Sequence, residues 1–416
     1  MENIPAFRED PYLVGASDYV AKLRFQTSQR TSKTWEELDA RLLKNESFGQ
    51  TLLDTGFLTA IGDSLRMKYP DTLARLTSAH TYVKQHLIWN GAHNLWADNL
   101  REVFNRKKGD AADLNLLLVA LLRATGLEAY PLALSTRDNG QILAEYPSLT
   151  SFNYVAALTT LGGKDIFLDA TLPYLPPDLL PSACLNGKGR VVDLAHARWV
   201  SLIPRQRMSV STTFRMAFGP DGTLSGQAEM ACAGYAALLW RMRLSAKDTS
   251  SFLQKTLEKS IPNFTVSQPS FANADSLAKP LYLRCTLQSR EPLQQAGERY
   301  YFMPLLGSER SENPFKAPTR TYPVDFGFPL EETNFVEYTL PPGITVEELP
   351  KAATFTLPDN YGRFMYSVIL NGNKLQISSR LVLRKPSFTG GEYSTLRAFF
   401  DKIVAKHAEQ VVLKRE

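Results

Sequence analysis

The chain has 416 residues, of which 44% are hydrophobic and 21% are charged. This composition excludes a disordered or collagen-like chain and predicts a globular protein of two or three domains. The formal net charge of +5 is spread over the whole length and is too dilute for a dedicated nucleic-acid-binding protein. We therefore expect no nucleic-acid partner.

No apolar stretch reaches the roughly 20 residues that cross a bilayer, so no membrane span is predicted. The opening run MENIPAFREDPY is polar and lacks the apolar segment of a secretory signal. The three cysteines, Cys184, Cys232 and Cys285, form neither a CxxC pair nor a zinc-site spacing. They exclude a disulfide framework but are compatible with a single bridge.

The first 108 residues are predicted to be helical, because apolar residues recur at helical spacing in TWEELDARLLKN and LARLTSAHTYVKQHLIW. The run GDAADLNLLLVALLRATG predicts a buried helix with Asp110 as N-cap, Asp113 in the first turn and Gly126 after its end. β-Rich runs follow in EAYPLALST, FNYVAALTT and KDIFLDAT, and Gly162-Gly163 indicates a hairpin between the last two. A helix packed on an antiparallel sheet is thus expected over residues 110–172, followed by a Pro-rich loop over residues 173–181.

From residue 205 onward, short β-rich runs separated by turn residues predict a mostly β half. A helical interruption is expected over residues 236–260. The run FMYSVILNGNKLQISSRLVL predicts a hairpin that turns at Asn371-Gly372. Helical spacing in YSTLRAFFDKIVAKHAEQVVL predicts a closing helix over residues 393–413.

Motifs for nucleotide and metal chemistry are missing from the sequence. It contains no GxGxxG, no Walker loop, no HExxH and no GxSxG, so nucleotide-fold and zincin interpretations lose their main support. On a helix, His80 and His86 would point about 240° apart, and Asn90-Gly91 is predicted to end that helix before His93. We therefore expect scattered histidines and no metal or cofactor.

Several runs resemble a known family. KKGDAADLNLLLVALLRATGLEAYPLALSTRDNG, SFNYVAAL and DIFLDATLPY resemble the core of transglutaminase-like, papain-related proteins. LPSACLNGKGRVV, NPFKAPTRTYPVDFGFP and LPDNYGRFMYS are similar to its bacterial envelope branch, in which a β-rich domain of unknown function follows the core. The resemblance implies an α+β fold. It implies a transglutaminase-like domain over residues 1–204, with a helical lead-in 1–108 and a core 109–204, and then a β-rich domain with a closing helix over residues 205–416.

The resemblance also implies where catalytic residues would stand. It places the nucleophilic cysteine at Ala111, the histidine at Tyr154 and the orienting acid at Asp169. The methyl group of an alanine cannot attack a carbonyl, and a phenol with an ordinary pKa near 10 hardly accepts a proton at pH 7. The sequence therefore predicts a triad that is inactive, with no catalytic residue among these positions.

Other residues keep more than one interpretation. Cys184 could be a relocated nucleophile or an inert thiol, and Asp169 is favoured as a structural clamp that accepts hydrogen bonds from Tyr154 or a backbone turn. Asn153, Trp89 and Trp96 could line a binding cleft, although core packing is favoured for both tryptophans. Residues 135–148 would form a polar lid, in which Arg137 could meet a carboxylate or lie in a solvated turn.

The favoured function is a catalytically inactive module that binds a protein, a peptide or a cell-envelope polymer through the former active-site cleft. Two alternatives are a cysteine peptidase or acyltransferase with a relocated nucleophile, and a structural scaffold of an envelope assembly. The resemblance places the protein in the periplasm or at the cell surface. It also implies that an export signal and a first β-rich domain precede the present residues.

Overall fold

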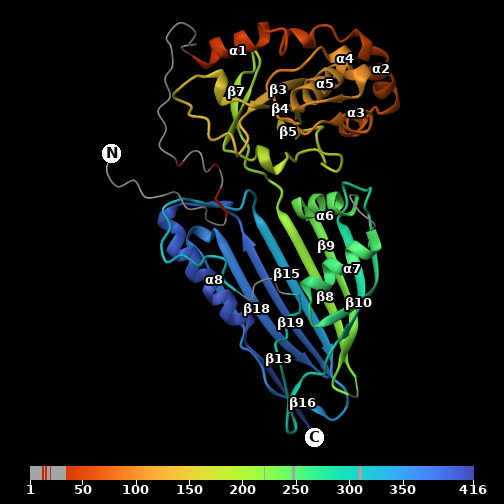
Figure 1. Cartoon of the computed structure of the whole chain (residues 1–416), viewed down its shortest axis with the longest axis vertical. Coiled ribbons are helices and arrows are strands. Elements are labelled where there is room, and N and C mark those ends of the chain that lie inside the picture. The colour runs from red at the N-terminus through yellow and green to blue at the C-terminus, as the bar shows by residue number, and fades with distance from the viewer. Residues whose placement is uncertain are drawn as a thin grey trace. The chain divides into compact units, whose positions relative to one another are not determined.

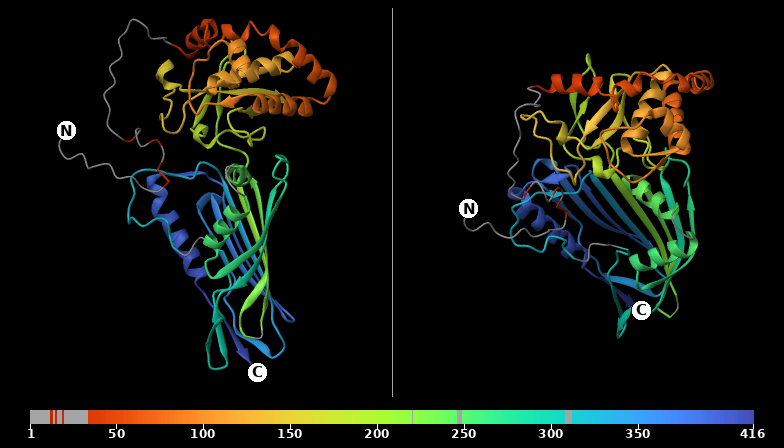
Figure 2. Two further views of the ribbon diagram at one scale, coloured as in Figure 1. Left: turned by 45° about the vertical axis from the view of Figure 1, so that its right-hand side comes forward. Right: turned by 45° about the horizontal axis from the view of Figure 1, so that its top comes forward.

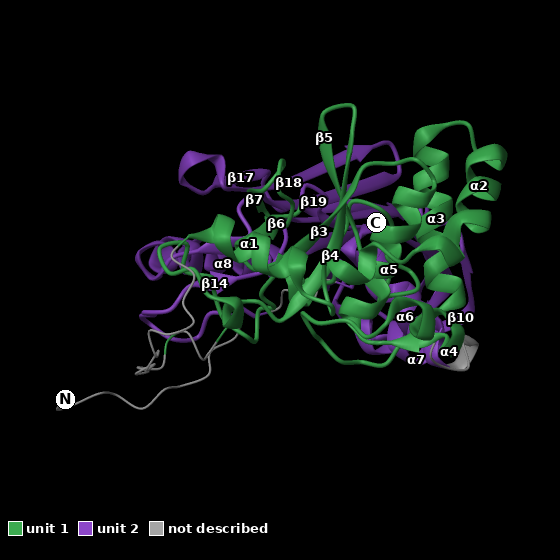
Figure 3. Cartoon of the chain, turned by 90° about the horizontal axis from the view of Figure 1, so that it is seen from above, with its two compact units in different colours: residues 1–204 green, residues 205–416 purple. Residues whose placement is uncertain are grey.

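The computed structural model describes residues 34–416 except 220, 246–248 and 308–311, together with residues 12, 13, 15 and 19. The predictions made on residues 1–11, and the part of the predicted helical lead-in at residues 14, 16–18 and 20–33, lie outside the described part. The chain divides into two compact units, residues 1–204 and 205–416 (Figure 3). Across the described residues, no helix combines the length and the apolar character needed to cross a bilayer.

Unit 1 combines a helical layer with a five-stranded sheet (Figure 1), and β1 and β2 form a separate two-stranded parallel sheet. Its helices are α1 (Trp35–Lys44), α2 (Thr59–Lys68), α3 (Thr72–His86), α4 (Leu100–Arg106) and α5 (Ala111–Ala124). Its strands are β1 (Ile88–Trp89), β2 (Lys108–Gly109), β3 (Ala129–Leu134), β4 (Tyr154–Leu161), β5 (Lys164–Leu168), β6 (Lys188–Val191) and β7 (Arg198–Ser201). Short 3-10 turns cover Gln50–Leu52, Gly56–Leu58, Leu149–Ser151 and Ser182–Cys184.

Helix α5 is the centre of unit 1 and begins where the sequence predicts. The Asp110 carboxylate accepts a hydrogen bond from the Asp113 N–H at 3.0 Å, and the Asp113 carboxylate accepts one from the Asp110 N–H at 3.1 Å. This reciprocal capping box satisfies two donors that a helix start would otherwise leave unpaired. The helix ends at Ala124, and Gly126 follows in a left-handed conformation with φ +82°.

The sheet that carries α5 is antiparallel, with strand order β5-β4-β3-β6-β7. The hairpin predicted at Gly162-Gly163 joins β4 to β5, with Leu161 opposite Lys164. Helix α5 packs against β3 and β4 on one side and against α2, α3 and α4 on the other. It is therefore buried on every face, which is why its apolar residues run almost without interruption.

Unit 2 is mostly β, as the sequence predicts (Figures 1 and 2). Its helices are α6 (Tyr235–Ser245), α7 (Thr249–Ser260) and α8 (Tyr393–His407). Its longer strands are β8 (Met208–Phe218), β9 (Leu224–Gly234), β10 (Phe264–Ala272), β11 (Leu281–Ser289), β15 (Leu330–Thr339), β18 (Gly362–Asn371) and β19 (Lys374–Leu383). Its shorter strands are β12 (Gln294–Ala296), β13 (Arg299–Phe302), β14 (Val324–Asp325), β16 (Ile344–Glu348), β17 (Ala353–Thr356), β20 (Ser387–Phe388) and β21 (Val411–Arg415).

One eight-stranded sheet dominates unit 2, with strand order β10-β11-β9-β8-β15-β19-β18-β17. The predicted hairpin is present, because β18 pairs with β19 and Asn371 lies opposite Lys374. Alternate residues of the strands form a core with α7 and α8, represented by Phe214, Leu283, Phe364, Leu257 and Phe400. The helices thus cover one face of the sheet, with α7 near β10 and α8 near β18 (Figures 1 and 2).

Two predicted helical segments differ from the structure. The interruption expected over residues 236–260 is two helices, α6 and α7. The closing helix predicted through residue 413 ends at His407, and its last part is strand β21, so that part of the prediction is wrong. Val411 and Leu413 are fully buried where β21 pairs with β13 and β16. The consecutive β-branched residues Val411 and Val412 favour this strand, which the helical spacing of the preceding residues obscures.

Candidate functional site

The three positions to which the resemblance assigns a triad lie at the ends of adjacent elements. Ala111 is the first residue of α5, Tyr154 is the first residue of β4, and Asp169 directly follows β5. Strands β4 and β5 are neighbours in the sheet, with Ala157 opposite Leu168. Ala111, Tyr154 and Asp169 are all at most 1% exposed. Whatever this arrangement does, solvent does not reach it.

A hydrogen bond joins Tyr154 directly to Asp169. The phenol donates to Asp169 Oδ2 at a distance of 2.7 Å. This is the contact expected if Asp169 is a structural clamp. The other carboxylate oxygen accepts from the Thr171 N–H at 2.9 Å and from the Thr171 hydroxyl. The carboxylate is therefore surrounded by donors, as a buried acid must be if it is to stay in the fold.

Asn115 ties this cluster to helix α5. Its amide nitrogen donates to Asp169 Oδ2 and to the Val155 carbonyl, both at 2.8 Å, and its amide oxygen accepts from the Ala170 N–H at 2.8 Å. Ala111 lies four residues earlier on the same face of the helix. The structure thus brings the start of α5, the start of β4 and the end of β5 to one place.

The start of α5 already carries negative charge. Besides the capping box, Asp113 accepts the Asp98 N–H at 2.7 Å and forms an ion pair with Arg106 at 2.8 Å. The Ala111 N–H donates to the Ala92 carbonyl at 3.2 Å. In a thiol enzyme the free N–H groups of such a helix start would stabilise a thiolate. Here the N–H groups of Ala111 and Asp113 instead donate to the Ala92 carbonyl and to the Asp110 carboxylate.

Burial governs the acid–base properties of the cluster. It raises the pKa of Asp169, an effect that the hydrogen bonds from Thr171, Tyr154 and Asn115 oppose. Burial, reinforced by the Asp169 charge, also raises the pKa of Tyr154 well above its ordinary value. Tyr154 is therefore a neutral donor at physiological pH and does not serve as a proton acceptor.

Cys184 also lies in this cluster, although it is 15 residues beyond Asp169 in the sequence. The 3-10 turn Ser182–Cys184 buries its thiol completely, beside the Tyr154 hydroxyl. Burial raises the pKa of Cys184 well above its ordinary value, and the charges of Asp169 and Asp138 add to this effect. A hydrogen bond with Tyr154 acts in the opposite direction but does not outweigh them. The thiol stays protonated, which is the inert form of a cysteine.

His80 lies behind Asp169 and is completely buried in α3. Its Nε2 lies 2.7 Å from the Asp169 carbonyl oxygen, so this nitrogen carries the proton and donates. Its Nδ1 has no hydrogen-bond partner. Burial, with a contribution from Lys84, lowers the pKa of His80 to about 3. Neutral His80 therefore holds the Asp169 backbone from the helical layer.

A half-buried rim borders the cluster. Trp89 and His93 stack nearly parallel, with ring centroids 5.7 Å apart and an interplanar angle of 8°. The His93 ring also meets Tyr154 edge-on at 5.3 Å. Asp138 is exposed, and His93 is among the groups that lower its pKa, after the hydrogen bond from Thr136. We call Trp89, His93 and Asp138 the aromatic rim.

The remaining predicted cleft residues have contacts within unit 1. The Asn153 amide accepts from the Thr136 N–H at 2.8 Å and donates to the Thr136 hydroxyl at 2.7 Å, so both ends of the amide are engaged. Arg137 is half-buried, and its N–H donates to the Ala183 carbonyl at 2.7 Å. Trp96 packs against the hydrophobic core of unit 1. The segment predicted as a polar lid starts with buried residues, Ser135 and Thr136.

Sequence reasoning missed three members of the site. Asn115 was visible only as a polar residue inside an apolar helix, a pattern that indicates a buried hydrogen-bonding role. Thr171 gave no signal, because its hydroxyl acts within a turn. The sequence predicts His93 to be one of several scattered histidines, since nothing in the local pattern shows that its loop returns to Tyr154. In the described part of the chain, no group of three or more histidines, cysteines or acids is placed to hold a metal ion.

Comparisons with known proteins support the fold more than the chemistry. Residues 298–413 match DUF3858, a domain of unknown function with a solved structure. No curated protein matches the chain. A crystal structure described as a "putative protease" from Parabacteroides distasonis superposes with a TM-score of 0.53 at 14% sequence identity. The superposition covers 95% of this chain and 63% of that protein, so this chain spans less than two thirds of its length. At this identity the likeness is one of fold.

Proposed function

We propose that unit 1 is a catalytically inactive, transglutaminase-like module. The observation that carries this proposal is the buried hydrogen bond between Tyr154 and Asp169, at the place where the resemblance would put a histidine and its acid. A neutral phenol, kept neutral here by burial that raises its pKa, is too weak a base to take a proton from a nucleophile. Ala111 supplies no nucleophile at the helix start. The cluster then acts as a polar lock between α5, β4 and β5.

A relocated cysteine enzyme is the competing function, because Cys184 lies beside Tyr154. Such an enzyme would need a thiolate and a base that accepts its proton. The nearest charges, those of Asp169 and Asp138, are negative and oppose thiolate formation. His93 stacks on Trp89 and meets the ring of Tyr154, and no hydrogen bond joins it to the thiol. The inactive module is therefore better supported than a cysteine enzyme with a relocated nucleophile.

Alkylation of thiols in the native protein tests this proposal. Burial raises the pKa of Cys285 to about 11 and that of Cys232 to about 12, and raises that of Cys184 well above 9. At neutral pH a pKa of about 11 leaves roughly 300-fold less thiolate than the ordinary value near 8.5. Incubation of the full chain with iodoacetamide at pH 7.5, followed by mass spectrometry, should leave all three cysteines unmodified.

Two controls accompany the alkylation experiment. In guanidinium chloride all three thiols should react, and a Thr150→Cys variant should gain one site that reacts in the native state, because Thr150 is exposed. Rapid, selective modification of native Cys184 would contradict the inactive module and favour the relocated nucleophile.

The binding role of the module is assigned to the aromatic rim. The cluster beneath the rim is closed to solvent, so a ligand would meet Trp89, His93 and Asp138 rather than the triad positions. A parallel aromatic pair beside a carboxylate suits an extended polypeptide or a glycan, which offers apolar faces together with hydrogen-bond donors. By resemblance we place this role in the periplasm or at the cell surface. A scaffold function would not require the rim.

Co-sedimentation tests the rim with two defined probes, purified peptidoglycan sacculi and agarose-coupled carboxymethylated casein. We expect the full chain to bind at least one of them, and His93→Ala to weaken that binding about tenfold, equivalent to 1.4 kcal/mol. His86→Ala is the matched control, because His86 is exposed and also stacks on an aromatic ring, but on that of Tyr82 and not on the rim. If His93→Ala binds both probes as strongly as His86→Ala does, the rim is not the binding site and the scaffold function is favoured.

A further inference from the structure

Strand β17 (Ala353–Thr356) forms one edge of the eight-stranded sheet of unit 2. Among the described residues it pairs only with β18, with Ala353 opposite Tyr366 and Thr356 opposite Arg363. An edge strand presents backbone N–H and C=O groups that another strand can pair with. The side chains of Thr354 and Thr356 are exposed.

The register identifies which backbone groups face outward. The Leu357 N–H donates to the Gly362 carbonyl at 2.9 Å, so the pair Leu357–Gly362 is a hydrogen-bonded pair. In an antiparallel ladder such pairs recur at every second residue, which makes Ala353 and Phe355 the residues bonded to β18. The N–H and C=O groups of Thr354 and Thr356 then point away from β18, toward the free edge.

A groove runs beside this edge, between β17 and helix α8. It has a volume of about 550 Å³, and α8 contributes Ser394, Thr395, Ala398, Phe399 and Lys402 to its wall. Three of these five side chains are short. Phe355 and Leu357 line it from the β17 side. The groove therefore offers an apolar floor and room for side chains next to an unpaired strand edge.

Lys402 gives the groove a positive charge. The side chain is exposed, and its ammonium group lies 5.9 Å from the centre of the Phe355 ring. Two neighbouring cationic groups already have carboxylate partners: Lys406 pairs with Glu409 at 2.6 Å, and Arg380 pairs with Glu331 at 2.6 Å. In the described part of the chain, no carboxylate pairs with Lys402. An occupant with a negative charge at this point would be complementary.

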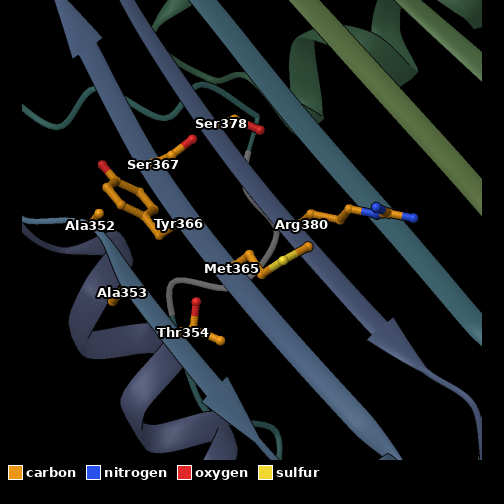
Figure 4. Close-up of a pocket in the computed structure, with 8 residues that line it drawn as sticks. All are labelled: Ala352, Ala353, Thr354, Met365, Tyr366, Ser367, Ser378 and Arg380. Atoms are coloured by element: carbon orange, nitrogen blue, oxygen red, sulfur yellow. The ribbon is translucent and has the colours of Figure 1, made fainter.

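A second hollow lies against the same edge (Figure 4). It has a volume of about 590 Å³ and is lined by Ala352, Ala353, Thr354, Met365, Tyr366, Ser367, Ser378 and Arg380. Thr354 lines both hollows. Successive side chains of a strand point to opposite faces of its sheet. A strand added beside β17 would direct one set of side chains toward α8 and the other toward this second hollow.

We propose that the edge of β17 binds an extended peptide as a ninth strand of the sheet, with an acidic side chain of the peptide beside Lys402. The backbone groups of Thr354 and Thr356 supply the main-chain hydrogen bonds, and the β17–α8 groove receives apolar side chains. Strand addition at a sheet edge is an established mode of peptide recognition. This site lies in unit 2 and does not depend on the function proposed for unit 1.

A random nonapeptide library displayed on phage, panned against the full chain, tests the proposal. We expect the selected peptides to share alternating apolar positions and one aspartate or glutamate. Thr354→Pro removes only the outward N–H, because the N–H of this residue is not used in pairing with β18 and proline is tolerated in edge strands. It should weaken binding of a selected peptide at least tenfold, whereas Thr354→Val, which keeps the N–H, should not. Circular dichroism and melting temperature would verify that each variant folds.

Charge reversal provides the second arm of the experiment. Lys402→Glu should weaken the selected acidic peptide at least tenfold and strengthen the same peptide with lysine in place of its acid. Lys164→Glu, at an exposed position in unit 1, should change the binding of neither the acidic peptide nor its lysine counterpart. The proposal is overturned if panning enriches nothing above the Thr354→Pro background, or if Lys402→Glu leaves the preference for acidic peptides unchanged. A concentration-dependent dimer that Thr354→Pro abolishes would assign the edge to a second copy of the chain and also overturn it.

Discussion

Replacement of Asp169 by alanine is expected to lower the free energy of unfolding of unit 1 by about 3 kcal/mol. The substitution leaves the Tyr154 hydroxyl, the Thr171 N–H and the Asn115 amide without a shared acceptor in a site closed to solvent. Each buried donor that loses its partner costs about 1–3 kcal/mol. Removing a carboxylate whose pKa is raised by burial relieves part of its desolvation cost. The net loss is therefore smaller than the sum of the broken bonds.

Urea unfolding followed by tryptophan fluorescence measures this loss. Four of the five tryptophans lie in unit 1, so the signal reports mainly on that unit; they are Trp35, Trp89, Trp96 and Trp199. Asp165→Ala is the matched control, because Asp165 is an acid of β5 whose ion pair with Arg198 is partly exposed. Exposed pairs contribute about 0–1 kcal/mol. A loss of less than 1 kcal/mol for Asp169→Ala would show that the cluster is not a structural lock.

Local sequence patterns were sufficient to predict part of this cluster. The helix start at Asp110 and Asp113 depends on side chains within three residues of one another, and the β4–β5 hairpin depends on two consecutive glycines. The contact between Tyr154 and Asp169 follows once those two strands pair, because both residues lie at the same end of the hairpin. Features determined by neighbours in the sequence can be recognised without a structure.

Contacts that depend on loop paths could not be predicted in the same way. Cys184 reaches Tyr154 through a Pro-rich loop, and His93 reaches it through the segment before α4. No periodicity fixes where such segments return to the fold. In unit 2 the parallel pairing of β15 with β8 joins strands about 120 residues apart, with Leu330 opposite Met208. Hairpin signals identify neighbours in the sequence and give no information about that pairing.

The free edge of β17 and the groove beside it could not be predicted from the sequence. The run LPDNYGRFMYS contributed to the family resemblance, yet neither the free edge nor the groove beside α8 follows from it. Both arise because β17 is short and α8 presents small residues at the position where they meet. Size complementarity between elements about 40 residues apart can be seen only in the folded chain.

Acidification should destabilise unit 1 through His80. Its pKa is about 3 in the folded protein, whereas the unfolded chain has the ordinary value near 6.5. Because the folded-state pKa is lowered, the unfolded state binds more protons between these values. The stability that neutral His80 contributes is therefore complete above pH 6.5 and is lost as the pH falls toward 3. The slope approaches about 1.36 kcal/mol per pH unit once the unfolded histidine is mostly protonated, so roughly 2 kcal/mol should disappear between pH 6.5 and pH 4.5.

His80→Gln isolates this contribution. A glutamine amide can donate to the Asp169 carbonyl as His80 Nε2 does, but it does not titrate. The slope of the unfolding free energy against pH between 4.5 and 6.5 should be smaller in this variant by about 1 kcal/mol per pH unit, which corresponds to roughly one bound proton. His86→Gln, at an exposed residue of the same helix, should keep the wild-type slope. Identical slopes for His80→Gln and the wild type would mean that His80 can take up a proton inside the fold. Nδ1, which has no hydrogen-bond partner, would then carry that proton.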